Sequence, residues 1–335
     1  MNRLLVERGC PCVIANILAV FSIGAGLILA SCAFAQTFPT KPIRLVTAGA
    51  PGSVPDTVAR PLAEKLAAEF QHPVVVENRP GAGGIVAMNL VAKARPDGYT
   101  LGLVSIAQMV FNLYLFDNLS YDPVHELTPV VKLVAGQAVL AAHPSFPADS
   151  VGGLISLAKA RPGTIHYAVP QLGAPPHIFA LLLSHEAQID MVAVPFRGAH
   201  EALASVVAGN VPVLFDASLI IAPQVKAGKL KALAVTGRER DRLLPETPTL
   251  AESGLPTVHG EAWIGLAAPA NLSPATITII NDAVARALRA ADLRQHYEDQ
   301  GWQIVGGSSI DFASAIRADH AIWGRIIRES RLKLN

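Results

Sequence analysis

The sequence predicts an α/β protein built from two doubly wound domains around a cleft. Short apolar runs rich in β-branched residues alternate with segments whose apolar residues recur every three to four positions, which is typical of strands alternating with helices. This alternation starts twice, once near residue 43 and again near residue 166. The chain has 335 residues, more than one hydrophobic core usually serves, so two domains are expected.

In the first half, strands are expected at 43–47, 74–76 and 101–105, with helices at about 57–70 and 85–93 between them. The first helix has a stripe at i+4 spacing formed by Val58, Leu62, Leu66 and Phe70. Asp56 stands where an N-cap is preferred. Pro61 lies one turn inside the pattern and is expected to kink the helix or delay its start. Strand–helix–strand order predicts parallel pairing, because parallel strands need crossover connections.

In the second half, strands are expected at 166–169, 191–195, 211–216 and 230–236, and helices at about 177–186 and 201–208. Helices follow at 274–290, 292–300 and 310–329. In the last of these, the expected apolar stripe is Phe312, Ile316, Ile322, Ile326 and Ile327.

The final helices have no strands of their own, so we expect them to pack on the first domain. The chain then crosses between domains near 130–142 and near 263–268, and two crossings form a hinge. The expected domains are 36–142 with 262–335, and 143–261.

The first 35 residues have the pattern of a signal peptide. Arg3 and Arg8 precede an uncharged apolar run at 13–30, which is followed by the A-x-A site at 33–35. We therefore expect export to the periplasm and cleavage after Ala35. A retained membrane anchor and a lipoprotein acylated at Cys32 are the alternatives. All three cysteines lie in this segment, so cleavage after Ala35 leaves a chain without thiols or disulfides.

Composition and motifs argue against several functions. The net charge is +1 and no basic stripe is present, so nucleic acid is not expected as a partner. The run at 81–84 fails as a dinucleotide fingerprint because Val86 stands where the third glycine belongs. No G-x-S-x-G or H-E-x-x-H motif occurs. We expect no catalytic residue, no metal site and no cofactor.

Several motifs, in order, carry a resemblance to a known family. They are Phe38–Arg44, Val74–Gly84, Pro96–Leu101, Lys226–Gly237 and Thr247–Pro256. In these the chain resembles, end to end, the Bug-type receptors of tripartite tricarboxylate transport systems. The resemblance implies a type II periplasmic binding protein fold, a two-crossing hinge and a monomer. It also implies a small carboxylate ligand delivered to membrane permease subunits. The alternative is a soluble sensor that closes on a ligand and signals to a partner such as a sensor kinase.

The resemblance also implies that two loops hold the carboxylate, each leading into a helix N-terminus, where unpaired N–H groups and the helix dipole favour anions. In the first loop the candidates are Pro51, Gly52, Ser53 and Val54, and in the second they are Gln171, Gly173 and Ala174. The chain departs from its relatives at Val54 and Pro55, and at Ala174, where relatives usually carry a hydroxyl. The prolines at 55, 175 and 176 also remove N–H donors.

Three further residues are candidates for the cleft. Gln108 follows the third strand and is expected on the wall of the first domain. Arg197 could pair with a carboxylate, or lie solvated on the surface. Asp216 closes a strand, where it either caps a local turn, the interpretation we favour, or contacts a ligand amine. Trp263, on a crossing strand, is expected to pack in the core or hinge.

Overall fold

The computed structural model describes residues 38–334. The expected signal peptide and its cysteines therefore lie outside the described residues. The chain divides into residues 1–40 and a compact unit of residues 41–335, and the fold that follows is that of the compact unit. Among the helices described, none combines the length and apolar character needed to cross a membrane.

The strands are β1 (Ile43–Thr47), β2 (Val74–Asn78), β3 (Thr100–Ser105), β4 (Leu127–Ala142), β5 (Ile165–Val169), β6 (Met191–Pro195), β7 (Val213–Ala217), β8 (Lys231–Val235), β9 (Glu261–Pro269) and β10 (Gln303–Gly306). The α-helices are α2 (Val54–Phe70), α3 (Ile85–Ala92), α4 (Asn112–Leu115), α5 (Val151–Ala160), α6 (Pro175–Ala187), α7 (Ala199–Val207), α8 (Ser218–Lys226), α9 (Pro274–Ala287), α10 (Ala291–Asp299) and α11 (Ser309–Ser330). A 3₁₀ turn, η1 (Ala82–Gly84), and a π-helical segment, η2 (Ala107–Phe111), complete the set.

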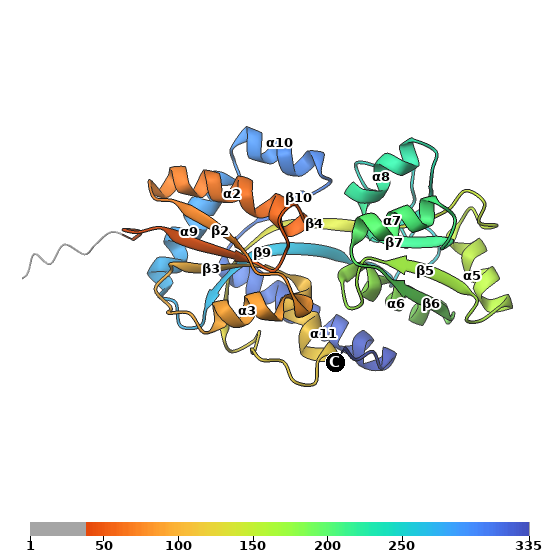
Figure 1. Ribbon diagram of the computed structural model, residues 1–335, viewed down its shortest axis with the longest axis horizontal. Helices are drawn as coiled ribbons and strands as arrows, with labels where there is room; N and C mark the ends of the chain where they lie inside the picture. The colour runs from red at the N-terminus through yellow and green to blue at the C-terminus, as the bar shows by residue number, and fades with distance from the viewer. Residues whose placement is uncertain (1–37, 335) are drawn as a thin grey trace, which may run out of the picture. The chain divides into compact units, whose positions relative to one another are not determined.

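The strands form one mixed sheet in the order β2-β1-β3-β9-β4-β7-β5-β6, and β8 and β10 also pair with β4 (Figure 1). β1 is parallel to β2 and β3, and β5 is parallel to β6 and β7. Both expected sets of parallel strands are therefore present, each with its first strand in the middle. They are not separate sheets, because the long antiparallel strands β4 and β9 join them.

Helices cover both faces of each parallel set. The crossovers β1-to-β2 and β2-to-β3 run in opposite directions, so right-handed connections place α2 and α3 on opposite faces, as Figure 1 shows. The same holds for α6 and α7. Buried side chains alternate accordingly, with Tyr167 and Phe215 in the cluster that contains α6 residues, and Ala168 and Leu214 in the cluster that contains α7 residues.

Helix α2 begins earlier than the sequence predicts. Its first residue is Val54 and its N-cap is Ser53, so Asp56 lies in the first turn and is not the N-cap. Pro55 fits there because the first N–H groups of a helix have no intrahelical acceptor. The helix continues through Pro61 to Phe70, so the expected delayed start is wrong.

The final helices pack partly as expected. The Tyr297 hydroxyl on α10 donates to the Val58 carbonyl of α2 (2.9 Å), which fixes α10 to the first strand set. Helix α11 reaches further, because Trp323 contacts both Phe111 of η2 and Phe179 of α6. The expected stripe of α11 is wrong at one position: Ile322 is 44% exposed and Trp323, its neighbour, is buried.

Candidate functional site

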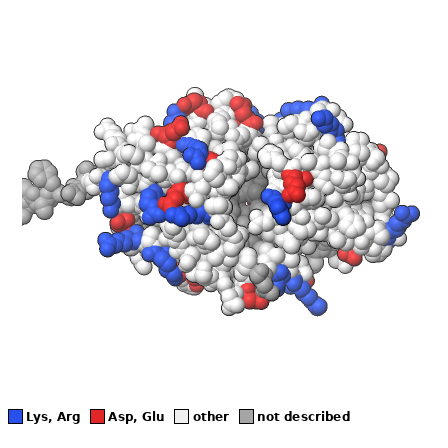
Figure 2. Space-filling model, viewed as in Figure 1, with Lys and Arg blue, Asp and Glu red and all other residues white. Residues whose placement is uncertain are grey.

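The two predicted ligand loops lie at equivalent points of the sheet. In each parallel set the first strand is central, so the chain reverses its direction of winding beside β1 and beside β5. In open α/β sheets, ligands bind in the crevice outside the carboxyl ends of strands at such a switch point. The loop at 49–53 follows β1 and the loop at 170–174 follows β5. The face in Figure 2 is hollowed near its centre, with charges of both signs scattered around it.

Asp56 organises the first loop. Its carboxylate accepts hydrogen bonds from the Gly52 N–H, the Arg60 Nε and the Asn78 Nδ2, each at 2.8 Å. Burial alone would raise the pKa of Asp56, but the bonds from Arg60, Gly52 and Asn78 outweigh it and lower that pKa. Asn78 also donates to the Gly49 carbonyl (2.8 Å). The loop is therefore held in shape by a carboxylate that stays ionised.

A hydroxyl and an amide of the first loop stay free of protein partners. The Ser53 Oγ is buried, and no hydrogen-bonding group in residues 38–334 reaches it. The Val54 N–H, the first of α2, likewise has no acceptor within the part of the chain described. The amides of Gly52 and Ser53 are already used, by Asp56 and by the Ala50 carbonyl, and Pro51 has none. The free donors therefore lie at the positive end of a 17-residue helix.

The second loop presents fewer donors. The Gly173 N–H donates to Nδ1 of His177 (3.0 Å), and the Ala174 N–H points to the Gln171 carbonyl at 3.3 Å. Burial lowers the pKa of His177 to about 4, so its ring is neutral at pH 7 and Nδ1 accepts. Pro175 and Pro176 supply no N–H. The Gly173 and Ala174 amides can therefore donate to an anion only by giving up these internal bonds.

At Gly173 the second loop lies close to residues that belong to neither β5 nor its helix. A Cβ added at this glycine would lie 2.6 Å from Leu334 Cδ1 and 2.9 Å from Leu115 Cδ1. Leu115 ends the α4 segment that follows β3, and its carbonyl accepts from the Leu334 N–H (2.8 Å). The second loop thus lies against the end of α4, which follows the first strand set, and against the C-terminal segment of the chain.

Gln108 and Arg197 have different surroundings. Gln108 Oε1 accepts from the Ser105 N–H (2.8 Å) and hydroxyl (2.6 Å), and its Nε2 donates to the Gly83 carbonyl (3.3 Å). Gln108 therefore ties the end of β3 to the neighbouring turn. Arg197 is exposed, and no carboxylate of the described chain pairs with its guanidinium.

Asp216 is the most unusual of the predicted residues. It is 4% exposed, its Oδ1 accepts from the Ala217 N–H (2.7 Å), and its Oδ2 has no hydrogen-bond partner in residues 38–334. Burial raises the pKa of this carboxyl to about 7. The local contact with Ala217 uses only one of its oxygens.

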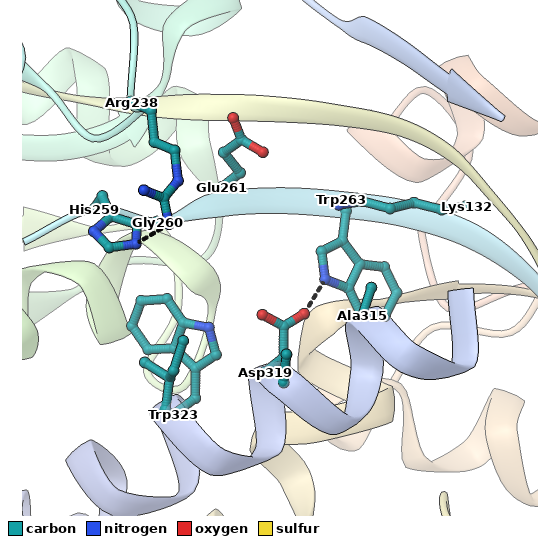
Figure 3. Close-up of a pocket in the computed structure, with 11 residues that line it drawn as sticks. Lys132, Arg238, His259, Gly260, Glu261, Trp263, Ala315, Asp319 and Trp323 are labelled. Carbon is teal, nitrogen blue, oxygen red and sulfur yellow. Dashed lines mark hydrogen bonds between the residues drawn. The ribbon is translucent and has the colours of Figure 1, made fainter. Parts of the chain in front are cut away.

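Sequence reasoning missed two hollows beside the crossing strands. The first, about 250 Å³, lies between β9 and α11 (Figure 3). There Arg238 donates to His259 Nε2 (2.7 Å), and Trp263 Nε1 donates to Asp319 Oδ2 (2.7 Å). Trp263 is 2% exposed, so its predicted packing role is confirmed. The second hollow, about 450 Å³, is lined by equal numbers of basic and acidic residues.

Neither hollow contains a predicted ligand residue. Their linings come from segments far apart in sequence, such as 238–242 and 294–304, so no local pattern could have found them. Among the described residues no group of His, Cys, Asp and Glu has an arrangement that could hold a metal ion.

The mixed sheet with its two parallel sets is the fold of a periplasmic binding-type receptor, and comparisons with known proteins specify it further. Residues 58–332 match the model of the tripartite tricarboxylate transporter family receptor. The chain is 30% identical to protein BugT of Bordetella pertussis over 319 residues, covering 95% of this chain and 97% of BugT. This chain belongs to the tripartite tricarboxylate transporter receptor family.

Solved structures agree. One is Rpa4515 of Rhodopseudomonas palustris with adipate, at a TM-score of 0.79 and 30% identity, covering 87% of this chain and 97% of that one. Another is MatC from the same organism with bound malate, at a TM-score of 0.78 and 31% identity, covering 87% of this chain and all of that one. The expected family and fold are confirmed.

Proposed function

We propose that this chain captures a small carboxylate between its two strand sets and delivers it to the membrane subunits of a tripartite tricarboxylate-type transporter. Family membership is the observation that carries the proposal. Two relatives of 30% and 31% identity hold adipate and malate, which are both dicarboxylates. The chain acts in this role as an exported monomer in the periplasm, freed by cleavage after Ala35, and it binds its ligand without converting it.

The first loop supplies the anion grip in this proposal. The free Ser53 hydroxyl and Val54 N–H at the start of α2 are donors suited to a carboxylate oxygen. Asp56 is the same loop's scaffold, so its negative charge is compensated by Arg60 and by amide donors.

The second loop closes the site from the other strand set. Gly173 of this loop lies beside Leu115, which follows the first strand set. A ligand shifts the hinge toward closure only as far as it binds the closed form better than the open form. The domain boundaries proposed are 36–142 with 262–335, and 143–261, with β4 and β9 as the crossings. Gly173 and Gln171 are the proposed contacts from this loop.

A thermal-shift comparison tests the function. The chain, purified from the periplasm of an expression host, is heated with adipate, malate and related carboxylates, and with their diamides as matched neutral controls. A carboxylate at one hundred times its Kd adds about 2.7 kcal/mol, which raises the melting temperature by several degrees. A shift for carboxylates and none for diamides supports the proposal. Equal shifts for both, or none for any carboxylate, would contradict it.

A further inference from the structure

Asp216 carries a buried oxygen that the protein leaves unused. The residue is 4% exposed, and its Oδ2 accepts no hydrogen bond from the rest of residues 38–334. No salt bridge to Asp216 is formed by a Lys, Arg or His of residues 38–334, and burial raises the pKa of its carboxyl while the Ala217 amide lowers it. Leaving a polar group buried without a partner destabilises a fold, and a charged group does so more strongly.

Asp216 lies in the strand set whose switch point the second loop occupies. It lies at the carboxyl end of β7, in the parallel set whose switch point is beside β5. Helix α8 starts two residues later at Ser218, with Ala217 as N-cap. The carboxylate therefore does not cap this helix, and the local contact with Ala217 satisfies only Oδ1.

One turn of the chain contacts both the start of α2 and the start of α8. Gln300 and Gly301 form a turn that touches two helix starts. The Thr57 hydroxyl in the first turns of α2 donates to Gln300 Oε1 (3.1 Å), and a Cβ added at Gly301 would lie 3.0 Å from Ser218 Oγ. The first turn of α2, which follows the free donors of the first loop, and Ser218, two residues after Asp216, thus both lie against this turn.

We propose that Asp216 determines ligand specificity by accepting a hydrogen bond from a hydroxyl or ammonium group on the bound carboxylate. The ligand then carries a carboxylate for the first loop and a hydrogen-bond donor for Asp216. This inference rests on the proposed function and narrows it to hydroxy- and amino-carboxylates. A plain carboxylate leaves Oδ2 unpaired and binds more weakly, because a buried acceptor without its donor is penalised.

Matched ligands test the preference. Succinate, malate and aspartate share one dicarboxylate frame and differ only at C2, as do glutarate, 2-hydroxyglutarate and glutamate. By calorimetry, at least one donor-bearing member should bind at least tenfold more tightly than its plain counterpart. In Asp216→Leu, which keeps the branching of the side chain but replaces both carboxyl oxygens with methyl groups, this ratio should fall to within about twofold. Equal affinities in the wild type, or a ratio retained in Asp216→Leu, would overturn the proposal.

A second readout needs no ligand. Since the unpaired oxygen destabilises the empty protein, Asp216→Leu should melt at a higher temperature than the wild type. The matched control is Asp241→Leu, because Asp241 is equally buried at 3% exposure but fixes a turn through the Leu243 N–H (2.8 Å). That control should melt lower. A lowered melting temperature for Asp216→Leu would assign Asp216 a structural role. Failure of every carboxylate to bind would refute the proposed function. The melting temperature of Asp216→Leu relative to wild type would then decide whether Asp216 has a structural role.

Discussion

Replacing Gly173 with valine tests the second loop, because its backbone and its surroundings both disfavour a side chain. Gly173 has φ +78°, in the left-handed region where an L-residue loses about 1–2 kcal/mol. The added Cβ would also lie 2.6 Å from Leu334 Cδ1 and 2.9 Å from Leu115 Cδ1. Both are ends of flexible side chains, so crowding adds about 1 kcal/mol or somewhat more. Gly173→Val should therefore lower the free energy of unfolding by about 2–4 kcal/mol.

A matched control separates strain from crowding. Gly228 has φ +68° and no atom within 4 Å of an added Cβ, so Gly228→Val experiences the backbone strain alone. Guanidinium denaturation followed by tryptophan fluorescence gives both stabilities, and calorimetry on the folded variants gives carboxylate affinity. We expect Gly173→Val to be less stable than Gly228→Val and to lose binding, which Gly228→Val keeps. If Gly173→Val were as stable as Gly228→Val and kept its affinity for carboxylates, the close approach of Leu115 and Leu334 to this loop would be refuted.

Three further predictions concern stability. Burial raises the pKa of Asp216 in the folded chain to about 7, against 3.8 for an ordinary Asp. The protonated carboxyl therefore makes its full contribution to the free energy of unfolding below pH about 4, and this contribution is lost as pH rises through 7. In urea denaturation, the free energy of unfolding of Asp216→Asn relative to wild type should thus increase by up to roughly 4 kcal/mol between pH 4 and 8. A difference that does not change with pH would contradict this. Trp263→Phe removes the 2.7 Å bond to Asp319, whose pKa burial already raises, and should lower the unfolding free energy by about 1–3 kcal/mol; an unchanged denaturation midpoint would count against that bond. Ending the chain after residue 331 removes the Leu334 bond to Leu115 and should speed hydrogen exchange in the 170–174 loop, whereas unchanged exchange would show that the terminal residues do not support the loop.

The sequence predicts both sets of parallel strands and several of the helices because apolar periodicity reports burial directly, but it predicts neither α5 nor α8. Apolar runs located β1, β5 and β7, and i+4 spacing located α2. The start of α2 was placed too late, because Asp56 is a good N-cap residue by type but its carboxylate is used by Gly52, Arg60 and Asn78. Only the folded loop reveals that competition.

Other features depend on contacts between distant segments. Strand β10 is short and pairs with β4 across more than 160 residues, so no local pattern marks it. Ile322 and Trp323 are adjacent and both apolar, and which of them is buried depends on Phe111 and Phe179. The residues of the ligand loops could be named from the sequence, but which of their donors stay free could not.

Amide hydrogen exchange with the most stabilising carboxylate tests the central claim, capture between the two loops, most directly. Exchange is compared with and without ligand for peptides spanning the whole purified chain. We expect slower exchange in peptides covering 49–56 and 170–177 together, because closure orders both loops at once. Slowing confined to 259–263 and 315–323, which line the hollow beside α11, with both loops unchanged, would place the ligand in that hollow and rule out capture between the loops.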